Sequence, residues 1–99
     1  MTARHDLALT EDAILDRLKV YARDELEIPD AVVDPVGPAT LLIEGLELDS
    51  LRQAMLLALI EEDYGVRLDG IDTGEFVALA SVGDLVRLIQ QHAGRPEAV

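Results

Sequence analysis

The sequence predicts an all-α fold: a small four-helix bundle with three longer helices, one short helix, and a long loop between the first two helices. Three segments carry apolar residues at three- and four-residue spacing, with helix-starting residues before them and glycine or proline after them. The chain has 99 residues and no cysteine, so we expect one domain without disulfide bonds. Hydrophobic residues make up 49% of the chain but aromatic residues only 3%, which predicts a core of Leu, Val, Ile and Ala.

The first predicted helix begins after Thr10. Threonine is a good N-cap, and Glu11 and Asp12 follow it, where the helix dipole favours negative charge. We expect Pro29 to end the helix, because proline disfavours helical conformation in the residue before it. Six apolar residues keep helical spacing over about four turns: Ile14, Leu15, Leu18, Tyr21, Ala22 and Leu26.

The segment from Pro29 to Leu48 is predicted to be a long ordered loop. Pro35, Gly37 and Pro38 interrupt any helical pattern there. Long loops in compact domains usually have a function, and this one would cross the bundle and deliver a serine to a helix start. Five of its residues are too apolar to be left in water: Val32, Val33, Leu41, Leu42 and Ile43.

The second longer helix is predicted from about Leu51 to Tyr64, with Gly65 as a good C-cap. Helical spacing places one set of residues on an inward face, with Gln53 at its edge: Leu56, Leu57, Ile60 and Tyr64. The opposite, outward face carries Leu51, Ala54, Met55, Ala58, Glu61 and Glu62. This stripe suits a docking surface, although scattered exposed apolar residues would explain it equally well.

A short third helix holding Phe76 is predicted to follow residues 72–73. Residues 10–93 would form the helical domain, between a flexible tail at 1–9 and a C-terminal tail at 94–99.

The last helix is predicted to follow a capping box. Ser81 and Asp84 have the spacing of that motif, with Asp in place of the usual Glu or Gln. Gly94 and Pro96 would end the helix. Its apolar residues are Val82, Leu85, Val86, Leu88 and Ile89.

The charge of the chain narrows the range of partners. Its formal net charge is -12, from 20 acidic and 8 basic residues. This balance argues against nucleic acid and against anionic membrane surfaces, and it favours partners with basic patches. An acidic surface that only keeps the protein soluble is the plainer explanation. No apolar run reaches membrane-spanning length and the N-terminus lacks a signal pattern, so we expect a cytoplasmic protein. We also expect it to act as a monomer.

Ser50 is the strongest candidate for covalent chemistry. It lies immediately before an amphipathic helix, where unpaired backbone N–H groups and the helix dipole suit a phosphate ester. The chain has only two serines, Ser50 and Ser81, and no cysteine. A serine in this position is more often just an N-cap, so the local pattern leaves both interpretations open.

Nucleophilic hydrolysis and metal binding find little support. His5 lies in the tail and His92 near a helix end, so neither is placed to act as a base for a serine. Residues 69–75 superficially resemble a calcium loop, but Ile71 and Thr73 stand where that loop needs oxygen-rich ligands. We therefore predict no catalytic residue and no metal site.

The residues from Gly45 to Leu51 read Gly-Leu-Glu-Leu-Asp-Ser-Leu. This run resembles the attachment motif of acyl carrier proteins, in which an Asp-Ser-Leu tripeptide starts the second helix. Residues 81–85 resemble the family's entry into the last helix, and residues 39–42 its loop upstream of the attachment site. The likeness continues, at the spacing of this family, through Leu56, Leu57, Ile60, Glu61, Glu62, Tyr64 and Gly65.

The resemblance implies a carrier and not an enzyme. In this family a phosphopantetheinyl transferase, with magnesium, moves 4′-phosphopantetheine from coenzyme A onto the serine, and the arm's thiol then holds acyl thioesters. Ser50 would be the attachment point, with Asp49 its adjacent acid and Leu51 beside it. An acyl ligase, ketosynthase or tailoring enzymes of polyketide, fatty-acid-like or other secondary metabolism would then dock on the outward face, through Leu51, Met55, Ala58, Glu61 and Glu62.

Two departures from the family pattern shape this expectation. The motif commonly has Gly where Glu47 stands, so the turn into the helix is expected to differ slightly. Arg52, Gln53 and Met55 occupy the first turns of a helix that often carries acids there. We therefore expect partly apolar docking and specialised partners.

Two alternatives to the acyl carrier stay open. A peptidyl or aminoacyl carrier has the same fold, but that subclass typically has Gly-Gly where this chain has Glu47 and Leu48. The second alternative is an unmodified helical interaction module in which Ser50 is only a cap.

Overall fold

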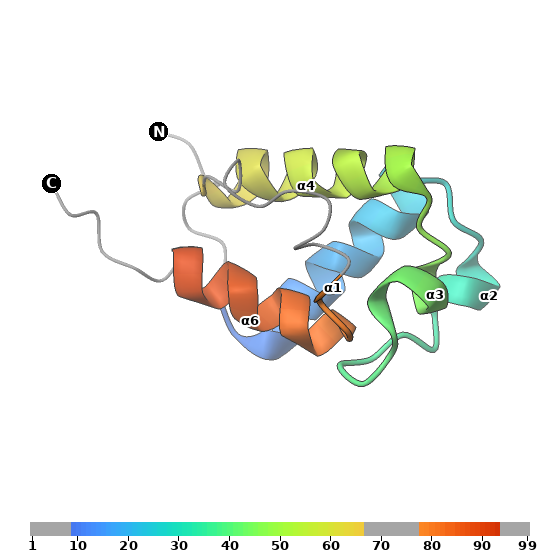
Figure 1. Cartoon of the computed structure of the whole chain (residues 1–99), viewed down its shortest axis with the longest axis horizontal. Helices are drawn as coiled ribbons and strands as arrows, with labels where there is room; N and C mark the ends of the chain where they lie inside the picture. Colours follow the sequence, from blue (N-terminus) through green and yellow to red (C-terminus); the bar gives the residue numbers. More distant parts are fainter. Residues whose placement is uncertain (1–8, 67–77, 94–99) are drawn as a thin grey trace, which may run out of the picture.

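Three helices, α1 (Glu11–Val20), α4 (Ser50–Tyr64) and α6 (Val82–Ala93), form the body of the protein (Figure 1). The computed structural model describes residues 9–66 and 78–93, and these are mostly helical, which confirms the predicted all-α class. The three longer helices are also confirmed. The predicted short helix after residues 72–73 lies outside the described residues, so the four-helix bundle itself remains a prediction.

The first helix begins as predicted and ends differently. The Thr10 hydroxyl accepts a hydrogen bond from the Ala13 amide, 3.2 Å away, as an N-cap does. After Val20 the chain continues as a π-helical turn, η2 (Tyr21–Glu25). A π turn holds one residue more than an α turn, and here it brings Leu26 round to the buried side of the helix. The helix therefore ends before Pro29.

The residue after this turn, Glu27, has a φ of 58°, in the left-handed region where non-glycine residues are uncommon. The Ile28 amide donates to the Ala22 carbonyl, 2.9 Å away, and closes the turn.

The segment predicted to be an irregular loop contains two short helices, α2 (Asp30–Val33) and α3 (Leu42–Leu46). Pro29 precedes α2, so this proline starts a helix as well as following one. Single helical turns are too short to show a periodic pattern, which is why the sequence did not reveal them. Val33 and Leu42 are buried as expected, but Leu41 is 51% exposed and corrects the prediction that it is buried.

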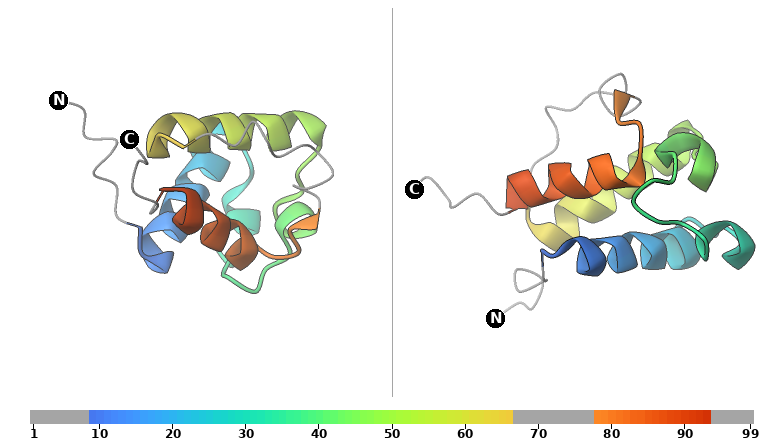
Figure 2. Two further views of the ribbon diagram at one scale, coloured as in Figure 1. Left: turned by 60° about the vertical axis from the view of Figure 1, so that its left-hand side comes forward. Right: turned by 90° about the horizontal axis from the view of Figure 1, so that it is seen from below.

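The connection between α2 and α3 is tied to the start of α6. The Leu42 amide donates to the Ala80 carbonyl (3.0 Å), and the Val82 amide donates to the Thr40 carbonyl (2.8 Å). Leu41 and Ser81 thereby form an isolated antiparallel bridge. The connection between α2 and α3 therefore lies beside the start of α6, as two further views show (Figure 2).

Lys19 holds the other end of the same connection. Its Nζ donates to the carbonyl oxygens of Asp34 (3.0 Å) and Val36 (3.3 Å). These carbonyls follow α2, where backbone acceptors lack intrahelical partners and attract a cation.

The core is mainly aliphatic, as its composition predicts, although Tyr21 and Tyr64 are also buried in it. Its largest fully buried side chains come from all three longer helices and from α2 and α3: Ile14, Leu42, Leu56, Ile60, Leu85, Ile89, Val33, Val82 and Val86. Among residues 9–66 and 78–93, no helix combines the length and apolar character needed to cross a membrane.

One polar contact joins the first helix to the end of α4. The buried Tyr21 hydroxyl donates to the Asp63 carboxylate, 2.5 Å away. Burial, together with this hydrogen bond and the charge of Asp63, raises the pKa of the Tyr21 phenol well above its usual value. Burial also raises the pKa of Tyr64.

We expect Gly83→Ala to destabilise the protein by about 1–2 kcal/mol, although alanine normally favours a helix. A Cβ at position 83 would lie 2.9 Å from the Pro38 carbonyl oxygen, so the connection would have to shift. Gly37→Ala is the matched control, since no atom lies within 4 Å of the corresponding Cβ. Urea denaturation of both variants tests this; a gain in stability for Gly83→Ala would contradict it.

The free energy of unfolding should fall as the pH rises above about 10, because tyrosine in the unfolded chain then ionises while folded Tyr21 stays neutral. Tyr21→Phe should reduce this pH dependence, and adding Tyr64→Phe should reduce it further. Urea titrations between about pH 8 and about pH 11 measure the effect. An identical pH dependence in wild type and both variants would rule out this origin.

Candidate functional site

Ser50 is the first residue of α4, and its side chain is exposed. The N-cap is Asp49, whose Oδ1 accepts a hydrogen bond from the Arg52 amide, 2.8 Å away. This corrects the local interpretation of Ser50 as the cap. Asp49 is extended and Ser50 is already helical, so the carboxylate and not the hydroxyl faces the open amide.

The Ser50 hydroxyl makes no hydrogen bond within residues 9–66 and 78–93. Ser81, the other serine, is engaged by contrast. Its Oγ accepts a hydrogen bond from the Asp84 amide (3.2 Å), and Asp84 Oδ2 accepts from the Ser81 amide (3.2 Å). This confirms the predicted capping box. The hydrogen bond from the Ser81 amide is the first cause that lowers the pKa of Asp84.

The turn before Ser50 is held by buried leucines on both sides. Leu46 and Leu48 are buried, and Glu47 between them has a φ of 56°. The Leu48 amide donates to the Ile43 carbonyl (2.9 Å), the arrangement that ends many helices with a left-handed residue. Glycine, the residue common at this position of the attachment motif, reaches this conformation without steric cost. Glu47 adopts the same left-handed conformation, so glutamate also allows the turn.

Gln53 adds a second tie to this turn. Its Nε2 donates to the Leu48 carbonyl, 3.2 Å away, from the first turns of α4. The position of Ser50 is therefore fixed from both sides along the chain.

The outward face of α4 is largely where the sequence places it. Leu51 is 69% exposed, and Ala54, Ala58 and Glu62 are exposed too. Met55 and Glu61 are half-buried, which corrects their assignment to the fully outward face. Met55 packs partly against the core.

Leu57, assigned to the inward face, is half-buried as well. A helix that lies on a domain surface has boundary positions beside its apolar stripe, and Met55 and Leu57 occupy them.

Two adjoining pockets run along this face, and we name them together the α4–η2 cleft. The first, of about 380 Å³, begins beside Ser50 and is lined by Glu25, Leu26, Glu27, Asp49, Leu51, Arg52 and Met55. The second, of about 220 Å³, is lined by Glu25, Met55, Ala58, Leu59 and Glu62. The cleft brings together the predicted residues Leu51, Met55, Ala58 and Glu62, and its linings do not include Glu61.

Glu25 and Glu27 form the wall of the cleft that the sequence did not predict. Arg52 connects this wall to α4, because its Nε donates to the Leu26 carbonyl, 3.2 Å away. Helical spacing along one helix gives no indication of which residues of another helix lie across from it.

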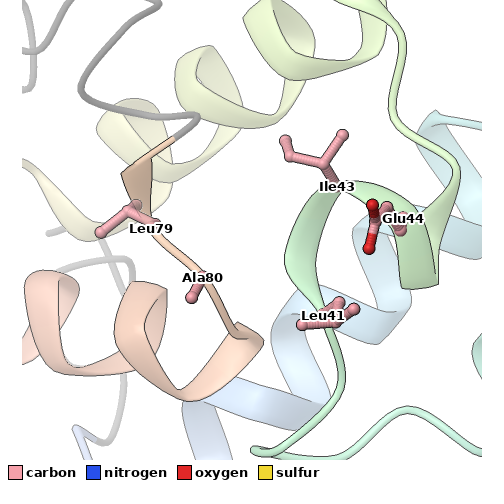
Figure 3. Close-up of a pocket in the computed structure, with 5 residues that line it drawn as sticks. All are labelled: Leu41, Ile43, Glu44, Leu79 and Ala80. Atoms are coloured by element: carbon pink, nitrogen blue, oxygen red, sulfur yellow. The ribbon is translucent and has the colours of Figure 1, made fainter.

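A separate pocket of about 320 Å³ lies between α3 and the segment before α6 (Figure 3). Leu41, Ile43 and Glu44 form one side, and Leu79 and Ala80 form the other. Its lining is mostly apolar, and Glu44 is the one charged residue among the described residues that line it.

Comparison with known proteins gives no relative: no family model matches the chain, and no curated protein matches it significantly. Within the part of the chain that the structure describes, no group of three or more His, Asp or Glu side chains could hold a metal ion. His92 is exposed at the end of α6, while His5 and residues 69–75 lie outside the described residues.

Substitutions of Asp49 and of Ser50 should change the free energy of unfolding by different amounts. Asp49→Ala should lower the free energy of unfolding by about 0.5–2 kcal/mol, since it removes the cap from α4. Ser50→Ala should change it by less than about 0.5 kcal/mol, since it removes no hydrogen bond. Asp49→Asn keeps a capping acceptor and is the control. A larger loss for Ser50→Ala than for Asp49→Ala in urea denaturation would contradict this assignment.

Proposed function

We propose that this chain is a stand-alone acyl carrier protein whose 4′-phosphopantetheine arm is attached to Ser50. The observation that carries the proposal is the exposed Ser50 hydroxyl at the first position of α4, which has no hydrogen-bond partner among residues 9–66 and 78–93 because Asp49 supplies the cap. The residues around it resemble the attachment motif of that family. A carrier is not itself an enzyme, and its chemistry is done by the proteins that dock on it.

The surroundings of Ser50 suit a phosphodiester group. The first amides of α4 lie at the positive end of the helix dipole, which favours a phosphate there. The Asp49 carboxylate accepts a hydrogen bond from the Arg52 amide. This hydrogen bond offsets part of the repulsion between the carboxylate and a phosphate on Ser50. When bound, the arm would supply a terminal thiol for acyl thioesters, which this cysteine-free chain does not contain.

The transfer of phosphopantetheine from coenzyme A requires an accessible hydroxyl on Ser50. The Ser50 Oγ forms a bond to the phosphorus of coenzyme A's pantetheine phosphate, and the pyrophosphate P–O bond breaks to release adenosine 3′,5′-bisphosphate. The hydroxyl proton leaves to a base of the transferase. The role of this chain is to present Ser50 rigidly.

Partners and cargo follow from two surfaces. The exposed part of α4 would receive the transferase, an acyl ligase, a ketosynthase or tailoring enzymes of polyketide or related secondary metabolism. The pocket between α3 and residues 79–80 is open and mostly apolar, so it is a candidate to shelter part of an acyl chain.

The unmodified interaction module is the second candidate function. The exposed Leu51 and the cleft beside it favour binding of a partner whether or not Ser50 is modified. A peptidyl or aminoacyl carrier is the variant of the first proposal that differs only in cargo.

Intact-mass measurement tests the carrier proposal. The purified protein is incubated with coenzyme A, magnesium and a broad-specificity phosphopantetheinyl transferase. Wild type should gain one phosphopantetheinyl group, and so should Ser81→Ala, whereas Ser50→Ala should gain none. Wild type that stays at its original mass would exclude the carrier function and favour the interaction module.

A further inference from the structure

The α4–η2 cleft combines an apolar floor with an acidic rim. Leu51, Met55 and Ala58 contribute apolar surface, with Leu51 69% exposed. Glu25 and Glu27 are exposed and stand on the wall opposite α4. An exposed apolar strip with a charged border is typical of a protein-binding surface.

Glu27 has an uncommon backbone conformation for a glutamate. With a φ of 58°, this residue occupies a conformation that costs about 1 kcal/mol for most residues and that glycine or asparagine adopts more readily. Glu47 has a similar φ of 56°, so this conformation does not by itself mark a functional residue. Glu27 differs in lining the cleft, where its carboxylate can pair with an incoming cation.

The charges in the cleft indicate what kind of surface fits it. Among the described residues that line it, Glu25, Glu27, Asp49 and Glu62 are acidic and Arg52 is the one basic residue. Arg52 is half-buried and donates its Nε to the Leu26 carbonyl. A complementary surface would present an apolar side chain for the floor and Lys or Arg for the rim. A second copy of this chain is a poor match, because each copy carries a net charge of -12.

The cleft is continuous with the candidate attachment site. Asp49 and Leu51, the two neighbours of Ser50 in the chain, both line it. Any protein that covers the Ser50 hydroxyl therefore also covers the near end of the cleft.

We propose that the phosphopantetheinyl transferase docks across the α4–η2 cleft, seating an apolar side chain against Met55 and Ala58 and pairing cationic side chains with Glu25 and Glu27. This inference rests on the proposed function, and it extends the docking surface from α4 onto the turn after η2. Glu27 is then a specificity-determining residue for the transferase.

Steady-state kinetics of the modification tests the docking. The carrier concentration is varied with coenzyme A, magnesium and a broad-specificity transferase. The double variant Glu25→Gln/Glu27→Asn should raise KM at least about fivefold with kcat within about twofold, since rim charges act on encounter and not on the chemical step. The KM of wild type should also rise with added salt, and that of the double variant should rise less.

Two single changes test the apolar floor. Met55→Glu and Ala58→Glu should each raise KM, because they place a carboxylate where an apolar side chain is seated. Ala58 is exposed, so Ala58→Glu keeps the test valid if the half-buried Met55 does not tolerate substitution.

Asp24→Asn is the matched control. It changes the net charge by the same amount as Glu27→Asn, from an exposed residue of η2 that does not line the cleft, and it should leave KM unchanged. Glu27→Asn alone should raise KM without lowering the melting temperature, a combination that a merely structural role would not produce.

The outcomes distinguish this inference from the function on which it rests. If wild type is not modified, the carrier proposal fails and the docking proposal is overturned with it. If Ser50 is modified and all cleft variants keep the wild-type KM, or if Asp24→Asn raises KM as much as they do, docking through the cleft is overturned and the carrier function stands.

Discussion

The hydrogen bond from the Arg52 amide to the Asp49 carboxylate determines how the candidate site is built. It satisfies an amide that no earlier turn of the helix can satisfy, and it fixes the point at which α4 begins. Because Asp49 takes this role, Ser50 enters the helix one residue later with its hydroxyl exposed and unengaged. The same bond directs the Asp49 carboxylate along the helix start and beside Leu51, at the near end of the α4–η2 cleft.

This arrangement depends on the turn at Glu47, whose position along the chain is fixed. Leu46 and Leu48 are buried on either side of the left-handed Glu47, so a shift of one residue would expose a leucine to water. Further away, the backbone pairing of Thr40 and Leu42 with the start of α6 holds α3 against the body of the protein. Aliphatic burial and backbone hydrogen bonds thus fix the position of Ser50.

The sequence predicts the longer helices because they are periodic over several turns and have recognisable ends, such as the Thr10 cap and the capping box of Ser81 and Asp84. It misses α2 and α3, since one helical turn carries no period. It also misses the π-helical turn, whose effect is a small rotation that only the packed core reveals. Local pattern and resemblance make Ser50 a candidate, but they do not indicate Glu25 and Glu27, because the approach of these residues to α4 depends on how two helices pack and not on spacing within either one.

The two serines show why a local motif is insufficient to assign chemistry. Both stand at helix starts, and both have an aspartate nearby. At Ser81 the aspartate follows three residues later, so serine and aspartate cap each other and the hydroxyl is engaged. At Ser50 the aspartate comes one residue earlier, takes the cap alone, and leaves the hydroxyl exposed beside an apolar, acid-rimmed cleft. The order of the two residues thus makes one serine part of a cap and leaves the hydroxyl of the other exposed.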